Sequence, residues 1–185
     1  MNRTIPARIL RVNHGGEHGA IRIYRAQIAL ARLRAPDLLP FLNHTLRHER
    51  EHLARFRALM PARAAKPCRL MWIWSIGGGL LGGITGLAGR KAILVCTEAV
   101  ERTVHRHLDD QLAYLGASDP EMSAVIREIQ VQELGHLRYA EASRGAANLL
   151  TRLLDGAIVG LTEALIWMST RGDSVRLTRD LRATA

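Results

Sequence analysis

A pattern of acidic residues and histidine that occurs twice restricts the fold of this chain more than any other feature. Each copy has a glutamate, a second glutamate 32 residues later and a histidine 35 residues later: Glu17, Glu49 and His52, then Glu101, Glu133 and His136. In a helix, the Glu-x-x-His spacing places both side chains on one face, one turn apart. Two helical hairpins that each supply one lone glutamate and one such pair carry the ligand set of a di-iron or di-manganese carboxylate bundle. The repeat therefore predicts an all-α four-helix bundle around a two-metal site.

Proline and glycine positions divide the chain into five expected helices, at residues 5–34, 37–60, 90–116, 119–145 and 149–171. Proline lacks the amide donor that a helix interior needs, so Pro36 and Pro61 are expected to separate helices. Asp119 is expected to cap the fourth helix, with Pro120 at its first position. A length of 185 residues does not require a second domain, so we expect residues 1–185 to form one domain.

The repeated glutamates fall on the apolar stripes of their helices. Glu17, for example, lies in line with Ile21 and Tyr24. A carboxylate buried alone would take up a proton or bind a cation, and a pair of divalent metal ions would supply the missing positive charge. Five other glutamates are expected to be ordinary solvated charges: Glu51, Glu98, Glu121, Glu128 and Glu141.

Among the other histidines near the repeated residues in sequence, three are considered for a role at the site. His44 and His48 precede His52 at intervals of four residues but have no matching carboxylate, so we expect them at the surface or in support of the ligands. His107 follows Glu101 closely enough to support the site by hydrogen bonding. For His107, a functional role and a structural role remain equally open.

Residues 70–89, LMWIWSIGGGLLGGITGLAG, form a segment of twenty residues without a charge, and basic residues flank it on both sides. The length just reaches that of a membrane-spanning helix, but seven glycines disfavour one regular helix in water. The segment is either a buried part of the core or an apolar surface that lies in a bilayer interface. Trp72, Trp74 and the basic flanks favour the interfacial interpretation.

Charge and cysteine content indicate a partner class and a compartment. The formal net charge of +9 and the isoelectric point near 10.9 imply an anionic partner, either acidic lipid or nucleic acid. Cys68 and Cys96 have no CxxC spacing, and no signal peptide is evident before them. We therefore expect a reduced intracellular compartment and two small core residues.

Several stretches, spread in order through the chain, resemble the demethoxyubiquinone hydroxylase family, the di-iron quinone monooxygenases of ubiquinone biosynthesis. They are RVNHGGEHGAIRIYRAQ at 11–27, EREHL at 49–53, AILVCTEAVE at 92–101, QELGH at 132–136 and LIWMSTR at 165–171. The six repeated residues fall in the family's ligand pattern. Asn13 stands where the family often has Asp, and Leu108 stands where its animal members have Tyr.

The resemblance implies a ferritin-like bundle on a membrane, with a fifth helix at its C-terminal end. Glu17, Glu49 and His52 would bind one iron, and Glu101, Glu133 and His136 the other, with Glu49 and Glu133 bridging. Two further residues are expected to support the ligands: Tyr24 and His107. The implied reaction hydroxylates the ring of a demethoxyubiquinone with dioxygen and two electrons from an external reductant such as NADH.

The resemblance also implies where the chain works and with what. We expect a peripheral membrane protein on anionic lipid, at the cytoplasmic face of a bacterial inner membrane or the matrix side of a mitochondrial inner membrane. The expected partners are a lipid quinone, dioxygen and an accessory lipid-binding protein, and nucleic acid is not expected.

Two enzyme alternatives and one structural alternative compete with this interpretation. A ferritin-like ferroxidase would use similar ligands but has no need for the charge-free segment at 70–89, and its iron content would far exceed two ions per chain. A di-iron hydroxylase of tRNA would explain the charge, yet the chain lacks an obvious platform of aromatic and basic residues. A membrane-bound bundle without metal would leave the repeated 32-residue interval unexplained.

Overall fold

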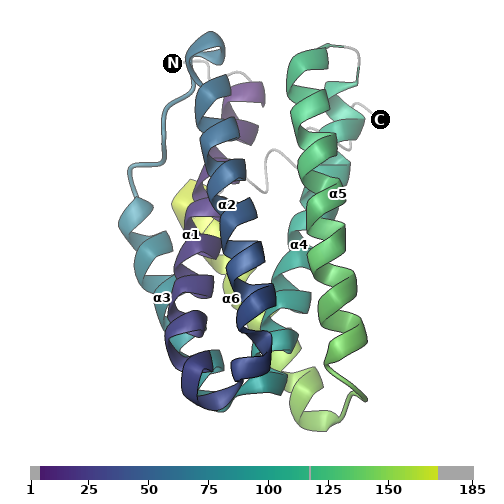
Figure 1. Ribbon diagram of the computed structural model, residues 1–185. Helices are drawn as coiled ribbons and strands as arrows, with labels where there is room; N and C mark the ends of the chain where they lie inside the picture. Colours follow the sequence, from purple (N-terminus) through teal and green to yellow (C-terminus); the bar gives the residue numbers. More distant parts are fainter. Residues whose placement is uncertain (1–4, 117, 171–185) are drawn as a thin grey trace.

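The computed structural model describes residues 5–116 and 118–170, and this part of the chain is built from α-helices and 3-10 turns without a strand (Figure 1). The helices are α1 (Ile5–Arg34), α2 (Leu39–Leu59), α3 (Met71–Ala88), α4 (Arg90–Leu115), α5 (Pro120–Ser143) and α6 (Leu149–Thr170). Short 3-10 turns, η1 (Pro36–Leu38) and η2 (Pro61–Arg63), precede and follow α2. The predicted all-α fold is confirmed.

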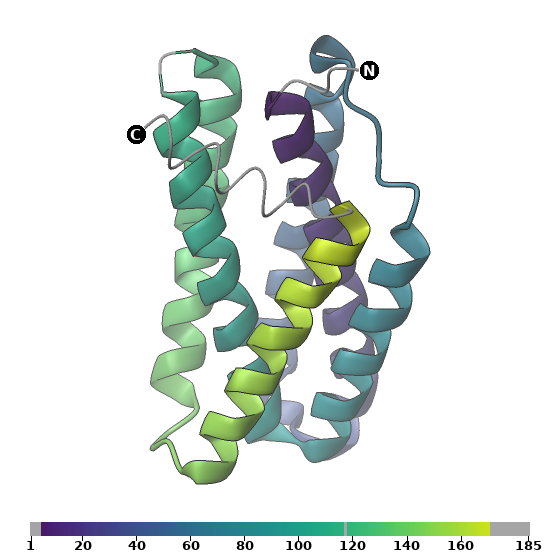
Figure 2. The same cartoon turned by 180° about the vertical axis from the view of Figure 1, so that it is seen from behind.

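Four of the helices form the bundle, and the other two cover one side of it. α1 packs with α2 and α4 packs with α5, so that two hairpins face each other, with α2 and α5 at the front of Figure 1. α3 and α6 contact α1, α4 and each other on the opposite side, as the reverse view in Figure 2 shows. Helices α3 and α6 therefore cover the side of the bundle formed by α1 and α4 and leave the side formed by α2 and α5 uncovered.

The expected helix boundaries agree with the structure to within two residues, except at 70–89. The Asp119 carboxylate accepts a hydrogen bond from the Met122 amide at 3.1 Å, and Pro120 is the first residue of α5, which confirms the predicted cap. Pro36 opens a 3-10 turn, and α2 therefore starts at Leu39 rather than at 37. The last residue of the expected helix 149–171 lies outside the described residues.

The expectation that glycine disfavours a regular helix at 70–89 is wrong, because α3 is continuous and its glycines pack against α1. A β-carbon added to Gly78 would lie 2.5 Å from the Gly19 carbonyl oxygen, and one added to Gly82 would lie 2.3 Å from the Ile23 carbonyl oxygen. Only glycine permits this approach of two backbones. The packing stabilises α3 and offsets the helix propensity that the glycines lack.

The two faces of α3 have different surroundings. Trp74 is only 5% exposed and packs beside Gly15 and Gly19. The expectation that Trp74 belongs to an interfacial surface is therefore wrong. The opposite face carries five large apolar side chains that are more than half exposed: Trp72, Ile76, Leu80, Ile84 and Leu87. Among the described helices, α3 alone is long and apolar enough to cross a bilayer by length and composition. The segment is thus core on one face and apolar surface on the other.

One of the glutamates expected to be solvated is buried. Glu98 is 7% exposed and forms ion pairs with Arg102, at 3.2 Å, and with Arg144 at the end of α5. Arg102 in turn lies 2.6 Å from Asp155 of α6. This charge network connects α4 with α5 and α6, and it satisfies a carboxylate that burial alone would penalise.

Candidate metal centre

The bundle interior is apolar at both ends and acidic in the middle. On each of the four bundle helices, the repeated residues lie between two clusters of buried apolar side chains. On α2, for example, Leu42 and Leu46 belong to one cluster and Phe56 to the other, with Glu49 and His52 between them. The helices therefore hold the acidic residues at one level of the bundle, away from water.

Each bundle helix contributes one buried carboxylate to this level. The exposed fractions are at most 6% for the four side chains: Glu17 of α1, Glu49 of α2, Glu101 of α4 and Glu133 of α5. Their ligand atoms and those of the two histidines fall into two groups in which all atoms lie within 4.8 Å of one another: Glu17, Glu49, His52 and Glu133; and Glu49, Glu101, Glu133 and His136. Glu49 and Glu133 are common to both groups. The geometry thus brings together all six repeated residues and places Glu49 and Glu133 between the two ligand groups.

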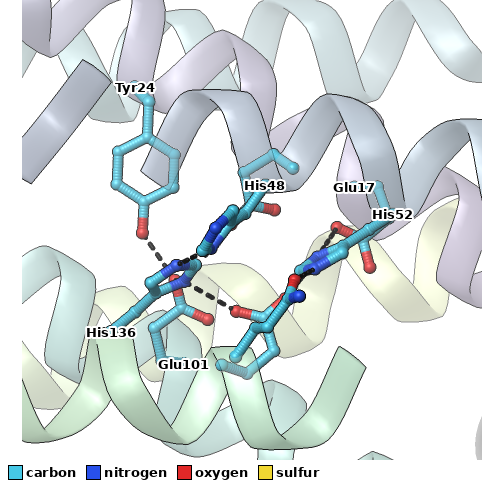
Figure 3. A network of polar contacts seen from close by, with 9 residues as sticks. Glu17, Tyr24, His48, His52, Glu101 and His136 are labelled. Carbon is cyan, nitrogen blue, oxygen red and sulfur yellow. Dashed lines mark hydrogen bonds and ion pairs between the residues drawn. The ribbon is translucent and has the colours of Figure 1, made fainter. Parts of the chain in front are cut away.

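Both imidazoles direct Nδ1 into the acidic cluster, as Figure 3 shows for His136. His136 Nδ1 lies 3.1 Å from a Glu133 oxygen and 3.7 Å from oxygens of Glu49 and Glu101. His52 Nδ1 lies 2.9 Å from a Glu133 oxygen and 3.7 Å from Glu17, yet it makes no hydrogen bond. The inner nitrogens therefore occupy the positions that metal ligands require.

Burial and close contact between charged groups change the proton affinities in the cluster. Burial and the charge of Glu133 raise the pKa of Glu49 well above its ordinary value and raise that of Glu101 to about 8. Burial lowers the pKa of His52, but the contacts with Glu133 and Glu17 together outweigh it and bring the pKa to about 11. Burial opposes ionisation of Glu133, but contacts with His136 and His52 outweigh it and lower its pKa. The cluster thus takes up protons where divalent ions would otherwise supply the charge.

The donor atoms fit a pair of first-row transition-metal ions. Glu49 Oε1 and His52 Nδ1 are buried without a hydrogen-bond partner, although buried polar atoms are normally paired. Four carboxylates and two imidazoles balance the charge of two divalent ions, and this mixture of oxygen and nitrogen ligands suits iron or manganese.

Tyr24 of α1 lies where the sequence analysis expects a supporting residue. Its hydroxyl donates a hydrogen bond to Glu101 Oε1 at 2.5 Å (Figure 3). The side chain is 2% exposed, and burial together with the carboxylates of Glu101 and Glu49 raises the pKa of the phenol well above 10.0. Tyr24 therefore holds one oxygen of Glu101 in a fixed direction.

A cavity reaches the acidic cluster from the covered side of the bundle. It is lined by all four carboxylates and by apolar side chains of α1, α3, α4 and α6: Val12, Ile23, Trp74, Leu81, Val104 and Leu165. The ligand histidines His52 and His136 do not line it, although Glu49 and Glu133 of the same two helices do. The metal positions would thus face an apolar chamber through oxygen ligands only.

Three polar residues interrupt the apolar wall of the cavity: Asn13, His107 and Thr162. Asn13 is held by two hydrogen bonds of 2.8 Å with Gln111. His107 Nε2 lies 3.2 Å from Glu163 of α6, and this contact lowers the pKa of the Glu163 carboxyl. His107 therefore lies at the cavity wall. Within the described part of the chain, it forms no hydrogen bond with the repeated residues.

Of the two histidines expected at the surface or in support, one lies within hydrogen-bond distance of a ligand, whereas the ring of His44 meets that of His136 edge-on at a centroid distance of 6.5 Å. His44 is exposed, whereas His48 is half-buried and places Nδ1 3.0 Å from His136 Nε2 (Figure 3). One sequence signal does distinguish His48 from His44, because His48, like Gln132, immediately precedes the glutamate of a Glu-x-x-His pair.

Comparison with known proteins places this geometry in a family. Residues 4–169 match the family described as ubiquinone biosynthesis protein COQ7. The chain is 38% identical over 166 residues to the 3-demethoxyubiquinol 3-hydroxylase of Rhodospirillum rubrum, covering 89% of this chain and 77% of the relative. It is 35% identical over 175 residues to the mitochondrial NADPH-dependent 3-demethoxyubiquinone 3-hydroxylase of Dictyostelium discoideum, covering 92% and 79%. The protein of that name from Homo sapiens is 34% identical over 140 residues, covering 74% and 64%. The chain therefore belongs to the COQ7 family of ubiquinone biosynthesis proteins.

Proposed function

We propose that this chain is a di-iron monooxygenase that hydroxylates the ring of a demethoxyubiquinone with dioxygen at a membrane surface. The observation that carries the proposal is the pair of ligand groups that share Glu49 and Glu133 and face an apolar cavity. The names of the Rhodospirillum and Dictyostelium relatives support the substrate and the reaction.

The residues have distinct proposed roles. Glu17 and His52 would hold one iron, Glu101 and His136 the other, and the shared glutamates would bridge them. When bound, the two irons supply the redox chemistry that activates dioxygen.

The cavity is suited to a ring with an apolar tail. Its aliphatic and aromatic lining excludes water from the carboxylate side of the centre, which protects an activated oxidant from side reactions. His107 and Thr162 are polar groups in this wall that would hydrogen-bond to ring oxygens and orient the ring. The hydrogen bond from Tyr24 keeps Glu101 in place while the ring approaches.

We further propose that the exposed face of α3 lies in the interface of an anionic membrane. Its row of large apolar side chains and the flanking basic residues match an interfacial helix. The close packing of the opposite face on α1 supports a helix that lies on the bilayer over one that crosses it alone. The membrane would be the inner membrane of a bacterium, on its cytoplasmic side, or of a mitochondrion, on its matrix side.

Iron binding tests the ligand assignment. Purified protein is expected to bind two Fe(II) ions per chain without oxygen, and Glu49→Ala or Glu133→Ala is expected to reduce this sharply, because each removes a shared ligand. Glu51→Ala is the matched control, since Glu51 lies on the exposed face of the same helix. Equal loss of iron in the Glu51 variant would contradict the assignment.

Product analysis tests the reaction. With a short-tailed demethoxyubiquinone, labelled dioxygen is expected to place its label in the new ring hydroxyl, whereas labelled water is not. Both NADH, the reductant expected from the family resemblance, and NADPH, for which the Dictyostelium and human relatives are named, are compared. Rapid Fe(II) oxidation that ends in a mineral core, with no labelled quinone under either reductant, would refute the proposal in favour of iron storage.

A further inference from the structure

The outer nitrogens of the two ligand histidines are held in a crossed arrangement. His52 of α2 places Nε2 2.6 Å from the amide oxygen of Gln132 on α5. His136 of α5 places Nε2 3.0 Å from Nδ1 of His48 on α2. Each Glu-x-x-His helix thus contacts the histidine of the other helix through the residue that precedes its own glutamate.

The contacts matter because of what an imidazole ligand requires. A neutral imidazole carries its proton on one nitrogen and a lone pair on the other. Both Nδ1 atoms face the acidic cluster, so metal binding needs the lone pair at Nδ1 and the proton at Nε2. The Nε2–H group then needs an acceptor, because a buried donor without a partner is costly.

The two acceptors differ in chemistry although they occupy equivalent places. The Gln132 amide oxygen carries no proton, so it can only accept a hydrogen bond. The His48 imidazole accepts at Nδ1 only when its own proton lies on Nε2, and its ring packs edge-on against that of His44 at a centroid distance of 4.2 Å. The two halves of the centre are therefore alike in their ligands and unlike in the groups behind them.

We propose that His48 and Gln132 are positioning residues that fix the ligand tautomers of His136 and His52, respectively. His48 acts on the metal position of Glu49, Glu101, Glu133 and His136, and Gln132 acts on that of Glu17, Glu49, His52 and Glu133. The inference rests on the proposed two-metal centre. It extends the correspondence between the two halves of the chain to the residue that precedes the glutamate of each Glu-x-x-His pair.

The test is anaerobic titration of the metal-free full chain with Fe(II) in competition with a chromophoric chelator. His48→Leu, which removes the acceptor, is expected to weaken one of the two binding steps by about 10- to 100-fold and to leave the other unchanged. His48→Gln is expected to restore that step to within a few-fold, because an amide oxygen serves the equivalent position on α5. Gln132→Leu is expected to weaken the other step.

Two controls separate positioning from a general effect on the fold. His44→Leu removes the exposed neighbour one turn away, whose ring meets those of His48 and His136 edge-on, and is expected to leave both steps unchanged. The melting temperature of the metal-free protein is expected to fall little in His48→Leu. In the protein loaded with Zn(II), which is diamagnetic, nitrogen-15 spectra are expected to show both ligand histidines protonated at Nε2 and to lose the slowly exchanging His136 proton in His48→Leu.

The outcomes distinguish the inference from the function on which it rests. Wild-type affinity for both ions in His48→Leu, a Gln variant as weak as the Leu variant, or equal loss in His44→Leu would each overturn the positioning role. Wild-type protein that binds fewer than two Fe(II) ions would instead refute the two-metal centre itself, and the positioning role with it.

Discussion

The contact between α3 and α1 can be tested by adding one methyl group. A β-carbon on Gly82 would lie 2.3 Å from the Ile23 carbonyl oxygen and 2.8 Å from its α-carbon, so Gly82→Ala cannot be relieved by a side-chain rotation. One helix has to move away from the other. The neighbouring Gly83 offers a matched control, because a β-carbon there meets no atom within 4 Å.

The two substitutions are expected to change stability in opposite directions. Overpacking against backbone costs roughly 3 kcal/mol, of which the better helix propensity of alanine returns about 1 kcal/mol, leaving Gly82→Ala destabilised by about 2 kcal/mol. Gly83→Ala keeps the gain of about 1 kcal/mol alone. For a chain of this size these values correspond to a melting temperature about 4–8 °C lower and about 2–4 °C higher, respectively.

Thermal unfolding followed by circular dichroism at 222 nm measures both shifts, in buffer and again with anionic vesicles. Gly82→Ala as stable as Gly83→Ala would refute the packing, since it would mean that α3 does not rest on α1. If the two variants differ in buffer but not on vesicles, α3 separates from α1 at the membrane, and the interfacial arrangement proposed above is wrong.

Three further predictions concern the centre, the surface and the proton balance. Tyr24→Phe removes the hydrogen bond to Glu101 and is expected to lower hydroxylation by about tenfold while the protein keeps its two irons, as turnover and iron assays would show. Trp72→Ser is expected to reduce the salt-resistant part of binding to anionic liposomes in sedimentation, whereas Trp74→Ser should leave that part unchanged and lower stability, because Trp74 is buried. Burial and Glu133 raise the Glu101 pKa from 4.5 to about 8, and contacts with Glu101 and Glu133 outweigh burial to raise the His136 pKa from 6.5 to about 9. The folded metal-free protein therefore binds more protons than the unfolded chain, so its free energy of unfolding should fall as pH rises from about 5 to 9 in urea titrations. Stability that increases over this range would contradict the assignment, and bound Zn(II) should remove the slope.

The candidate centre could be identified from sequence because its signal is periodic. Helical spacing and the 32-residue interval identify six side chains without knowledge of any tertiary contact, and all six lie in one buried cluster. The apolar stripe of Glu17 also indicates its burial. A spacing argument works here because every ligand lies on a regular helix.

What could not be predicted depends on contacts between distant segments. Glu98 has the surroundings of an exposed residue until Arg144, 46 positions later, is brought beside it. Trp72 and Trp74 look equivalent in sequence, and only the position of α1 makes one of them core. The glycines of α3 disfavour a helix by propensity, yet Gly78, Gly82 and Gly86 recur every four residues, the spacing of a close helix contact.

The exposed face of α3 has a kinetic consequence. Trp74 and Leu81 of this helix line the cavity, while Trp72 and Leu80 point outward, so the chamber and the outer apolar surface are separated by the thickness of one helix. On a bilayer, a quinone would reach the centre sideways from the lipid and not from the aqueous phase. The rate would then follow the mole fraction of quinone in the lipid. Adding empty lipid at constant total quinone would slow an enzyme that stays on the vesicles, whereas adding buffer would not.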